Sequence, residues 1–530
     1  MNNVARSPLS ASLVMGVAFN ASPALALDGN PSNYESLLPT LKPGDTLNLA
    51  PGTYTGGLNI NALNGTEEAP IVIVGPSDHS AVFEGNGCCN TVEIVNSSYV
   101  AVRSIKVDGK NIDGVFGVSA KNSSNNNVHH ITVEDCLFVG QNASQQTVGI
   151  STKTPTFGWI IRRNVIEGAG TGLYLGNSNY DEPFVGGLIE HNLIKDTIGY
   201  GMQIKNQNPW PNHPALPAAD SKTIIRHNVF IKNDQPSPDG VRPNLFIGSP
   251  PQSGVGSGSI TEVYGNVFYH NSHDEGLVQA TGRVSIHDNL FIDASDEALL
   301  LQTHDGFPLV YATVYNNTIY GAKRGIVFGS AASEKGLVFG NLVFADSPIE
   351  GSPGSQENNI VGAIADAAQY VSAPGTTLGQ IDFYPLPDKV TGTSLNFADV
   401  QSDTAVMCDF NGAPKGEGIF RGAYAGQGDN PGFQVAAEIK PAPLNCASNG
   451  GGGGAGAGGN TGTGGNGGQL TGGTAGSQNE GGNGSSNGGG CACRAGSAPY
   501  AEGFWFGWIA FMVGIGRRKR GFYKPQTPNT

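Results

Sequence analysis

The chain has few basic residues and no cysteine spacing typical of a metal site. Its 530 residues include 29 lysines and arginines against 43 aspartates and glutamates, which gives a formal net charge of −14. Nucleic-acid binding needs a basic face for the phosphates, so this balance argues against it. The 7 cysteines do not have the spacing of a zinc site. An acidic ligand fits this composition only where positive charge is gathered locally.

The first 26 residues have the pattern of a secretory signal. Arg6 precedes an apolar run over residues 9–19, and the tripeptide Ala-Leu-Ala that ends at Ala26 has the form of a cleavage site. We therefore expect an exported mature chain that begins after Ala26. Export permits disulfides, and Cys408 with Cys446 is the pair we would test first.

A short phrase recurs along the body: apolar, two polar residues, Asn, apolar. Nothing helical has such short apolar runs with Asn and Gly between them. The repeated Asn tolerates a left-handed turn and can bond its neighbour in a ladder. Cys136 holds the same place in an earlier copy and is expected to pack inside. The asparagines are Asn164, Asn192, Asn228, Asn266, Asn289, Asn317 and Asn341.

A second phrase follows each first one after a short turn, as in GLYLGN from Gly172 and GMQIKN from Gly201. Each repeat thus holds two or three short strands, which is the content of one coil of a solenoid. The sequence predicts an all-β, right-handed parallel β-helix over residues 27–446. A β-sandwich is the structural rival, but it would not keep equivalent residues in columns across eight repeats.

The start of the body resembles a known family. The segment LKPGDTLNLAPGTYTGGLNI, from Leu41 to Ile60, resembles the opening of β-helix proteins such as the chondroitinase-B and alginate-lyase group of polysaccharide lyases. The resemblance covers about residues 32–110 and implies the fold more strongly than the activity. The late phrase from Asp409 to Gly426 is similar to the closing coil of such proteins.

The composition changes after the body. Residues 447–490 are mostly Gly, Asn, Ser, Thr and Ala, which predicts a flexible linker. Residues 491–530 contain Cys491 and Cys493, a short apolar stretch and an Arg/Lys cluster, and this order resembles myxobacterial-type C-terminal sorting signals. That resemblance implies a transmembrane segment that a sorting protease removes near one of the two cysteines. A permanent membrane anchor is the alternative. Either way we expect the body at the cell surface or outer membrane.

Alternation along the second phrase places one column of side chains outward. It reads Lys121, Lys153, Gly176, Lys205, Gly248, Ala280 and Gln302, and a neighbouring column includes Gln203. Two sheet spacings of about 4.8 Å put Lys153 and Lys205 about 10 Å apart. Three stacked lysines on an acidic protein offer a place for a polyanionic chain, although surface lysines that only aid solubility are about equally expected. We take Lys121, Lys153 and Gln203 as substrate-binding candidates.

Two insertions follow this column. Residues 206–221 bring Trp210 and His213 to its rim, and residues 233–258 carry Arg242. Insertions on one face of a solenoid usually build its binding face. Trp210 can stack on a sugar ring, or it can pack the loop onto the body.

The lyase resemblance implies a catalytic set. In that group the base is a Lys with an Arg nearby, which puts Lys205 as base and Arg242 as the group that neutralises the substrate carboxylate. His213 or His227 would be the acid. The group also uses calcium held by Asn and Glu, and no matching ligands lie beside Lys205 in the sequence.

A carboxylate cluster lies further along. Asp274, Glu275, Asp296 and Glu297 occupy equivalent places in adjacent coils. They can bind calcium through oxygen ligands or act as a glycosidase pair. Basic residues fall in the same column, so a ladder of ion pairs between coils is the interpretation that we favour.

Two functions of different classes remain open from the sequence. The first is an enzyme acting on acidic polysaccharide, most simply a lyase by β-elimination, with an epimerase as a variant that shares the proton abstraction. The second is a non-catalytic surface protein that binds glycans or partners through the same lysines.

Overall fold

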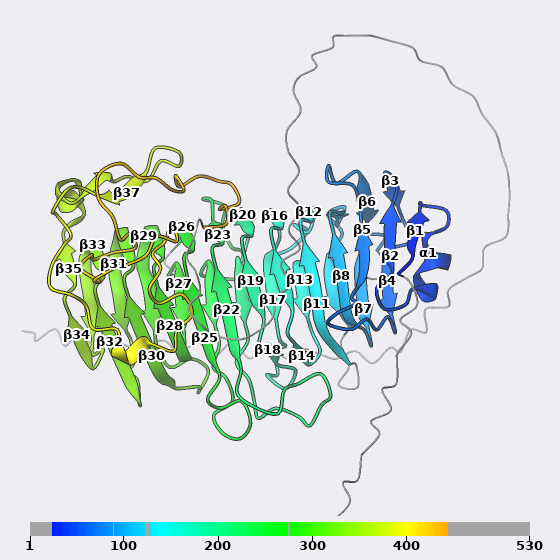
Figure 1. The fold of residues 1–530 in the computed structure, drawn as a ribbon, viewed down its shortest axis with the longest axis horizontal. Helices are drawn as coiled ribbons and strands as arrows, with labels where there is room; N and C mark the ends of the chain where they lie inside the picture. Colours follow the sequence, from blue (N-terminus) through cyan, green and yellow to red (C-terminus); the bar gives the residue numbers. More distant parts are fainter. Residues whose placement is uncertain (1–23, 88–89, 122–126, 274–275, 444–530) are drawn as a thin grey trace, which may run out of the picture. The chain divides into compact units, whose positions relative to one another are not determined.

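The computed structural model describes residues 24–443 apart from 88–89, 122–126 and 274–275, and within them the chain coils around one axis (Figure 1). Every coil lays its strands beside those of the previous coil, and all strand pairs of the coils are parallel. The only antiparallel strand pair among the described residues joins β36 (Val371–Ala373) to β37 (Asp382–Pro385), after the last coil. The predicted parallel β-helix is therefore confirmed.

The first sheet runs the length of the coil. Its strands in spatial order are β1 (Ala26–Gly29), β2 (Thr46–Leu49), β5 (Ile71–Val74), β8 (Ser98–Arg103), β11 (Val128–Glu134), β15 (Ile160–Arg162), β19 (Leu188–Glu190), β22 (Lys222–Arg226), β25 (Ile260–Tyr264), β28 (Gly282–His287), β30 (Leu309–Tyr315), β32 (Lys335–Phe339) and β34 (Ser355–Glu357). Two short strands, β14 (Thr156–Phe157) and β18 (Phe184–Val185), extend it at one edge.

Two further rows of strands close each coil. One row holds β3 (Gly52–Tyr54), β6 (Ala81–Glu84), β9 (Lys106–Asp108), β12 (Leu137–Val139), β16 (Val165–Glu167), β20 (Leu193–Lys195), β23 (Val229–Ile231) and β26 (Val267–Asn271). The other, the third row, holds β4 (Leu58–Asn61), β7 (Val92–Val95), β10 (Val118–Ala120), β13 (Val148–Thr152), β17 (Thr171–Leu175), β21 (Met202–Ile204), β24 (Leu245–Ile247) and β27 (Val278–Ala280). The two rows merge in the long strands β29 (Leu290–Leu301), β31 (Thr318–Phe328) and β33 (Leu342–Gly351), and β35 (Ile360–Gly362) ends them.

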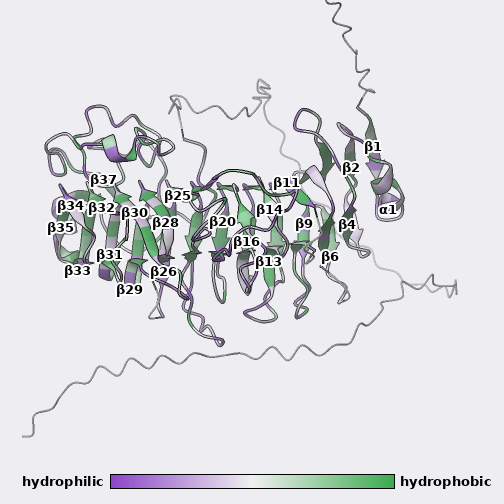
Figure 2. Cartoon of the chain, turned by 90° about the horizontal axis from the view of Figure 1, so that it is seen from below, coloured by the Kyte–Doolittle hydropathy of each residue, from purple (hydrophilic) through white to green (hydrophobic). Residues whose placement is uncertain are grey.

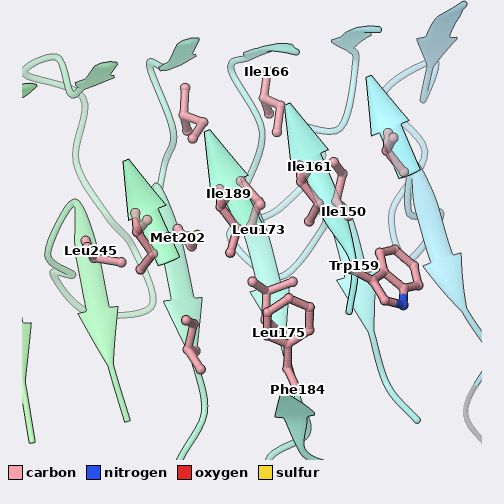
Figure 3. Packing of buried hydrophobic residues seen from close by; sticks show 14 of the residues in the cluster. Ile150, Trp159, Ile161, Ile166, Leu173, Leu175, Phe184, Ile189, Met202 and Leu245 are labelled. Atoms are coloured by element: carbon pink, nitrogen blue, oxygen red, sulfur yellow. The ribbon is translucent and has the colours of Figure 1, made fainter. Parts of the chain in front are cut away.

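Apolar side chains fill the inside of the coil. Strand residues alternate between the two faces, and the inward ones line up from coil to coil. Ile150, Leu173, Met202 and Leu245 form one such column, and all four are fully buried (Figure 3). Hydrophobic colour gathers on the strands and hydrophilic colour on the loops (Figure 2). At the N-terminal end, α1 (Tyr34–Leu37) and η1 (Leu38–Thr40) close the core, with Tyr34 edge-on to Tyr54 at 5.0 Å.

The predicted asparagine ladder is present. Asn192 shows the pattern: its Oδ1 accepts the backbone N–H of Asn164 at 3.0 Å, and its Nδ2 donates to the carbonyl of Ile161 at 2.9 Å. The same bonds repeat from Asn164 to Asn359. Cys136 is buried and free and stands where the ladder begins, with its N–H bonded to Asn164 Oδ1 at 3.0 Å. The ladder satisfies buried polar groups that a turn would otherwise leave unpaired.

The outward column of the first sheet is a stabilising ladder of charges and rings. Glu190 bonds Arg226 with an Nη2–Oε2 distance of 2.6 Å, and Arg226 donates to the hydroxyl of Tyr264 at 3.0 Å. The rings of Tyr264, His287, Tyr315 and Phe339 then stack from coil to coil at 4.6–5.0 Å. Arg162 likewise pairs with Glu134 and Glu190, so these arginines join neighbouring coils.

The C-terminal part of the body folds back along the coils. After η2 (Ile364–Gln369) and η3 (Ala398–Val400) it returns from the β35 end toward β23, in orange in Figure 1. Two buried lysines fasten it: Lys415 Nζ lies 2.8 Å from Asp288 Oδ2, and Lys440 Nζ donates to the carbonyls of Gly265 at 2.8 Å and Phe410 at 2.6 Å. Cys408 is disulfide-bonded, and Cys446 lies outside the described residues, so their pairing stays a prediction.

Candidate functional site

The predicted lysine column exists at the end of the third row of strands. Lys121, Lys153 and Lys205 directly follow β10, β13 and β21, and Gly176 lies between the last two. Backbone bonds fix this register: Gly176 N–H donates to the carbonyl of Thr152 at 3.2 Å, and Lys205 N–H donates to that of Leu175 at 2.9 Å. A Cβ on Gly176 would lie 3.1 Å from the Cβ of Lys205, so a larger residue at position 176 would crowd the Lys205 side chain.

One position of the predicted column is wrong. Val278, rather than Leu277, pairs with Leu245, so Ala280 points inward opposite Ile247. Thr281 takes the place in the lysine column, where its N–H bonds the carbonyl of Ile247 at 3.0 Å. Both Leu277 and Val278 are buried, so the alternation of apolar residues could not fix the register there.

Lys205 has an unusual environment for a lysine. Its Nζ lies 5.7 Å from the ring centre of Tyr174 and 5.5 Å from that of Tyr180. Among the residues that the structure describes, no carboxylate lies within 4.0 Å of this ammonium group. Burial lowers the pKa of Lys205 below its usual range, Asp305 opposes this, and the charge of Arg242 lowers the pKa further. A lysine of this kind loses its proton more readily and can act as a base.

The charge of Arg242 acts on Lys205 and lowers its pKa. Arg242 comes from the Arg242 loop, which we define as residues 232–244 between β23 and β24. Its guanidinium carbon lies 5.6 Å from the ring centre of Tyr200. Its Nη1 donates to the carbonyl of Val241 at 2.6 Å, and its Nη2 donates to that of Asp239 at 3.1 Å. The guanidinium is thus held by its own loop.

Three residues of this site were missed by the sequence reasoning. Tyr180 donates its hydroxyl proton to Asp305 Oδ2 at 2.8 Å, and burial followed by this bond raises the pKa of Tyr180 to about 12. His304 lies 4.7 Å from the ring of Phe246, and burial lowers its pKa, aided by the charges of Lys205 and Arg242. Tyr180 follows the column residue Gly176 by a few positions, and His304 and Asp305 follow the column residue Gln302. This closeness in the sequence is the signal that could have identified them.

A further acid group lies beside the column. Glu182 is 8% exposed, and Asn177 Nδ2 donates to its Oε2 at 3.1 Å. Burial first, and then the charge of Asp181, raise the pKa of Glu182 to about 7, while Asn177 and Lys153 oppose the rise. This carboxyl group is therefore partly protonated near neutral pH.

The other predicted substrate-binding residues differ in surroundings. Lys153 Nζ lies 4.7 Å from the ring centre of Phe116 and 5.5 Å from that of Tyr174. Lys121 Nζ instead pairs with Glu93 Oε1 at 3.2 Å, at the exposed end of the column. Gln203 is buried at 5% exposure and lies in register between Tyr174 and Phe246. Aromatic rings thus lie close to Lys153 and Lys205, whereas Lys121 is paired with a carboxylate.

The first insertion packs onto the second. Trp210 Nε1 donates to Gln207 Oε1 at 2.6 Å, and its ring lies against Gly256, where a Cβ would come within 2.5 Å. His213 Nδ1 accepts the N–H of Ala215 at 3.1 Å and so caps a turn of its own loop. The roles of Trp210 in stacking and of His213 as acid stay predictions.

His227 does not belong to this site, contrary to the prediction. It lies in the turn after β22, next to the asparagine ladder, and is 6% exposed. Lys440 of the returning segment lies 3.4 Å from its Nδ1, and the ring of His191 stacks on it at 5.0 Å. Burial and the charge of Lys440 lower the pKa of His227 well below its usual value, so it stays neutral. The returning segment covers this imidazole, which leaves it inaccessible to a substrate at Lys205.

Two of the four candidate metal ligands, Asp296 and Glu297, contact an arginine instead. Arg324 binds both oxygens of Asp296, at 2.8 and 3.0 Å, and also contacts Glu297. The ladder of ion pairs that we favoured is thus present at these two residues. Asp274 and Glu275 lie outside the described residues, and within the described ones no group of three His, Cys, Asp or Glu is placed to hold a metal ion.

Of the three predicted processing sites, the structure describes Ala26. Ala26 is the first residue of β1 and pairs with Thr46 of β2, while Cys491 and Cys493 lie outside the described residues. Within residues 24–443, less the three short gaps, no helix is long and apolar enough to cross a membrane.

Comparison with known proteins agrees with this geometry. Residues 148–364 match the family model described as right handed beta helix region. The protein is a right-handed parallel β-helix. No curated protein sequence matches the chain.

The chain is distantly similar to several solved structures. The alginate lyase AlyGC of polysaccharide lyase family 6 is 15% identical, with a TM-score of 0.39, and the match covers 64% of this chain and 53% of that one. The chain thus spans about half the length of AlyGC. Pectate lyase Pel9A is 14% identical, with a TM-score of 0.44, and the match covers 72% of this chain and 95% of that one. An alginate lyase from Paenibacillus sp. str. FPU-7 is 15% identical, with a TM-score of 0.34, and the match covers 64% of this chain and 95% of that one.

Proposed function

We propose that this β-helix binds an acidic polysaccharide along the lysine column and cleaves it by β-elimination, with Lys205 as the base. The observation that carries the proposal is the state of Lys205. Its ammonium group lies 5.7 Å from the ring centre of Tyr174 and 5.5 Å from that of Tyr180, and its pKa is lowered by burial and by the charge of Arg242. A lysine that only aids solubility would be exposed or paired with a carboxylate.

The residues of the site can divide the reaction between them. Neutral Lys205 takes the proton on the carbon beside the uronate carboxylate, whose charge Arg242 neutralises. The electron pair then forms the carbon–carbon double bond as the bond to the glycosidic oxygen breaks. Tyr180, kept protonated by burial and by Asp305, is placed to give that oxygen its proton. An epimerase would share the first step and return the proton to the same carbon.

A non-catalytic binder is the second candidate. Lys153 and Lys205 both lie over aromatic rings, an arrangement that suits a charged sugar without any chemistry. In a binder, affinity would fall with each lysine removed from Lys121, Lys153 and Lys205. In the lyase, loss of Lys205 would abolish turnover and leave most of the affinity.

The cellular setting is part of the proposal. The signal before Leu27 would export the chain, and the segment after residue 490 would attach it to a membrane until a sorting protease acts near Cys491 or Cys493. Sequencing both ends of the protein purified from its native cells tests this, because it predicts an N-terminus at Leu27 and no residue beyond Cys493.

The activity test is a substrate panel. The full chain is incubated with alginate, pectate and glycosaminoglycans, with and without calcium, and absorbance of the unsaturated uronate is followed. We expect a rise on one substrate that Lys205→Ala abolishes. Lys195→Ala is the matched control, because Lys195 is the last residue of β20 in a neighbouring row and pairs with Glu167 at 3.1 Å. No rise on any substrate would contradict the lyase and favour the binder.

A further inference from the structure

The Arg242 loop is held to the body by a histidine between two carboxylates. His270, near the end of β26, has its Nδ1 2.7 Å from Asp293 Oδ2 on β29. Its Nε2 lies 2.9 Å from Asp234 Oδ1, near the start of the Arg242 loop. A neutral imidazole has only one N–H, so it can donate to only one of these carboxylates. The observed bridge therefore requires the imidazolium form.

The same strand end also holds the other end of the loop. Asn271, next to His270, donates its Nδ2 to the carbonyl of Arg242 at 3.0 Å. Lys232 Nζ donates to that carbonyl at 2.6 Å, and the amide of Gln145 bonds the loop tip at Asp239 and Gly240. The bonds of Gln145 involve no titratable group, whereas the His270 bridge depends on a proton.

We propose that His270 is a positioning residue: protonated, it ties Asp234 to Asp293, fixes the Arg242 loop, and so strengthens binding of the acidic polysaccharide. The part that concerns the polysaccharide rests on the proposed function. The attachment of the Arg242 loop by His270 does not rest on the proposed function, because it follows from the contacts of the unliganded chain.

The charges around His270 determine the direction of the effect. Asp293 and Asp234 raise the pKa of His270 above its usual 6.5, against an opposing contribution from burial. The ring of Tyr269 lies 5.8 Å away, and His273 lies near enough to Asp234 to lower the pKa of that carboxyl group. A raised pKa means that the bridge is fully formed below pH 6.5 and is lost as pH rises through the higher folded value. Asp234, whose side chain is 81% exposed, is the partner that separates.

Hydrogen exchange of the unliganded full chain tests the hold on the loop. Protection of the amides at 233–243 is compared between the wild type and His270→Gln at each pH from 5.5 to 9. We expect the wild type to be about two- to fivefold more protected at low pH, the range for one partly exposed ion pair, and the difference to vanish at high pH. His79→Gln is the matched control, because His79 bonds the carbonyl of Asp135 instead.

Affinity for alginate and polygalacturonate is measured in parallel. We expect His270→Gln to weaken binding by a similar factor at low pH only, and to add nothing in an Arg242→Ala background. Equal loop protection in wild type and His270→Gln at every pH, with the amides of the first sheet unchanged, overturns the inference. Normal loop behaviour in a wild type that binds neither polymer contradicts the proposed function instead.

Discussion

Asn228→Ala removes one member of the asparagine ladder and should be strongly destabilising. The side chain is fully buried. Its Oδ1 accepts the backbone N–H of Asn192 at 3.0 Å and the Nδ2 of Asn192 at 2.9 Å. Its Nδ2 donates to the carbonyl of Ile189 at 2.9 Å and to Asn266 Oδ1 at 3.0 Å. The substitution deletes these four bonds and a fifth, from Nδ2 to the carbonyl of Arg226 at 3.0 Å, and leaves the N–H of Asn192 without this acceptor.

The magnitude follows from these losses. An orphaned buried donor costs about 1–3 kcal/mol, and the bonds made by the two Nδ2 hydrogens of Asn228 and by the Asn192 amide contribute about 1 kcal/mol each, so we expect a loss of about 4–6 kcal/mol. Urea unfolding followed by circular dichroism measures it. Asn48→Ala is the control, since Asn48 is exposed and its bond to Asp28 spans 3.3 Å; it should cost less than about 0.5 kcal/mol. A loss below about 1 kcal/mol for Asn228→Ala would refute the view that the ladder stabilises the coil.

Three other predictions concern the returning segment and the site. Lys415→Met leaves the buried Asp288 carboxylate without its cation and with His287 as its remaining side-chain partner, and should cost about 3–5 kcal/mol in urea unfolding, whereas Lys335→Met, which breaks an exposed pair with Asp399, should cost less than about 1 kcal/mol. Gly248→Ala would place a Cβ 2.4 Å from the carbonyl carbon of Lys205 and should reduce turnover at least about tenfold by displacing that lysine, while Gly375→Ala, in open space, should not. Turnover should rise with pH with a midpoint below 10.5, because Lys205 acts without its proton, and Arg242→Gln should move the midpoint upward in a kcat/KM profile.

The coil and its ladders could be predicted because their signals are local. Asn164 and Asn192 recur at equal places in short repeats, and the alternation of Arg162 and Glu190 identifies a column whose members attract each other. Alternation also placed Lys153 and Lys205 in one column. It failed at Val278, where two adjacent apolar residues are both buried and either register satisfies the core.

The rest of the site depends on contacts that periodicity does not encode. The repeat places His227 in a turn, where its imidazole could be open to substrate. In the fold, Lys440, which is 213 residues later, lies beside it because the chain folds back. Tyr180 and Asp305 meet across 125 residues through turns of unequal length, so nothing in the repeat pairs them. Solenoid periodicity predicts the coil-to-coil neighbours and leaves the loops undetermined.

The most direct test of the account compares turnover and affinity for one variant. On the substrate that the panel identifies, Lys205→Ala should lower kcat by at least about 10³-fold, as loss of a base does, while the dissociation constant changes less than about tenfold. Equal losses in both quantities, or turnover that survives without Lys205, would contradict the claim that this lysine is the base of an acidic-polysaccharide lyase.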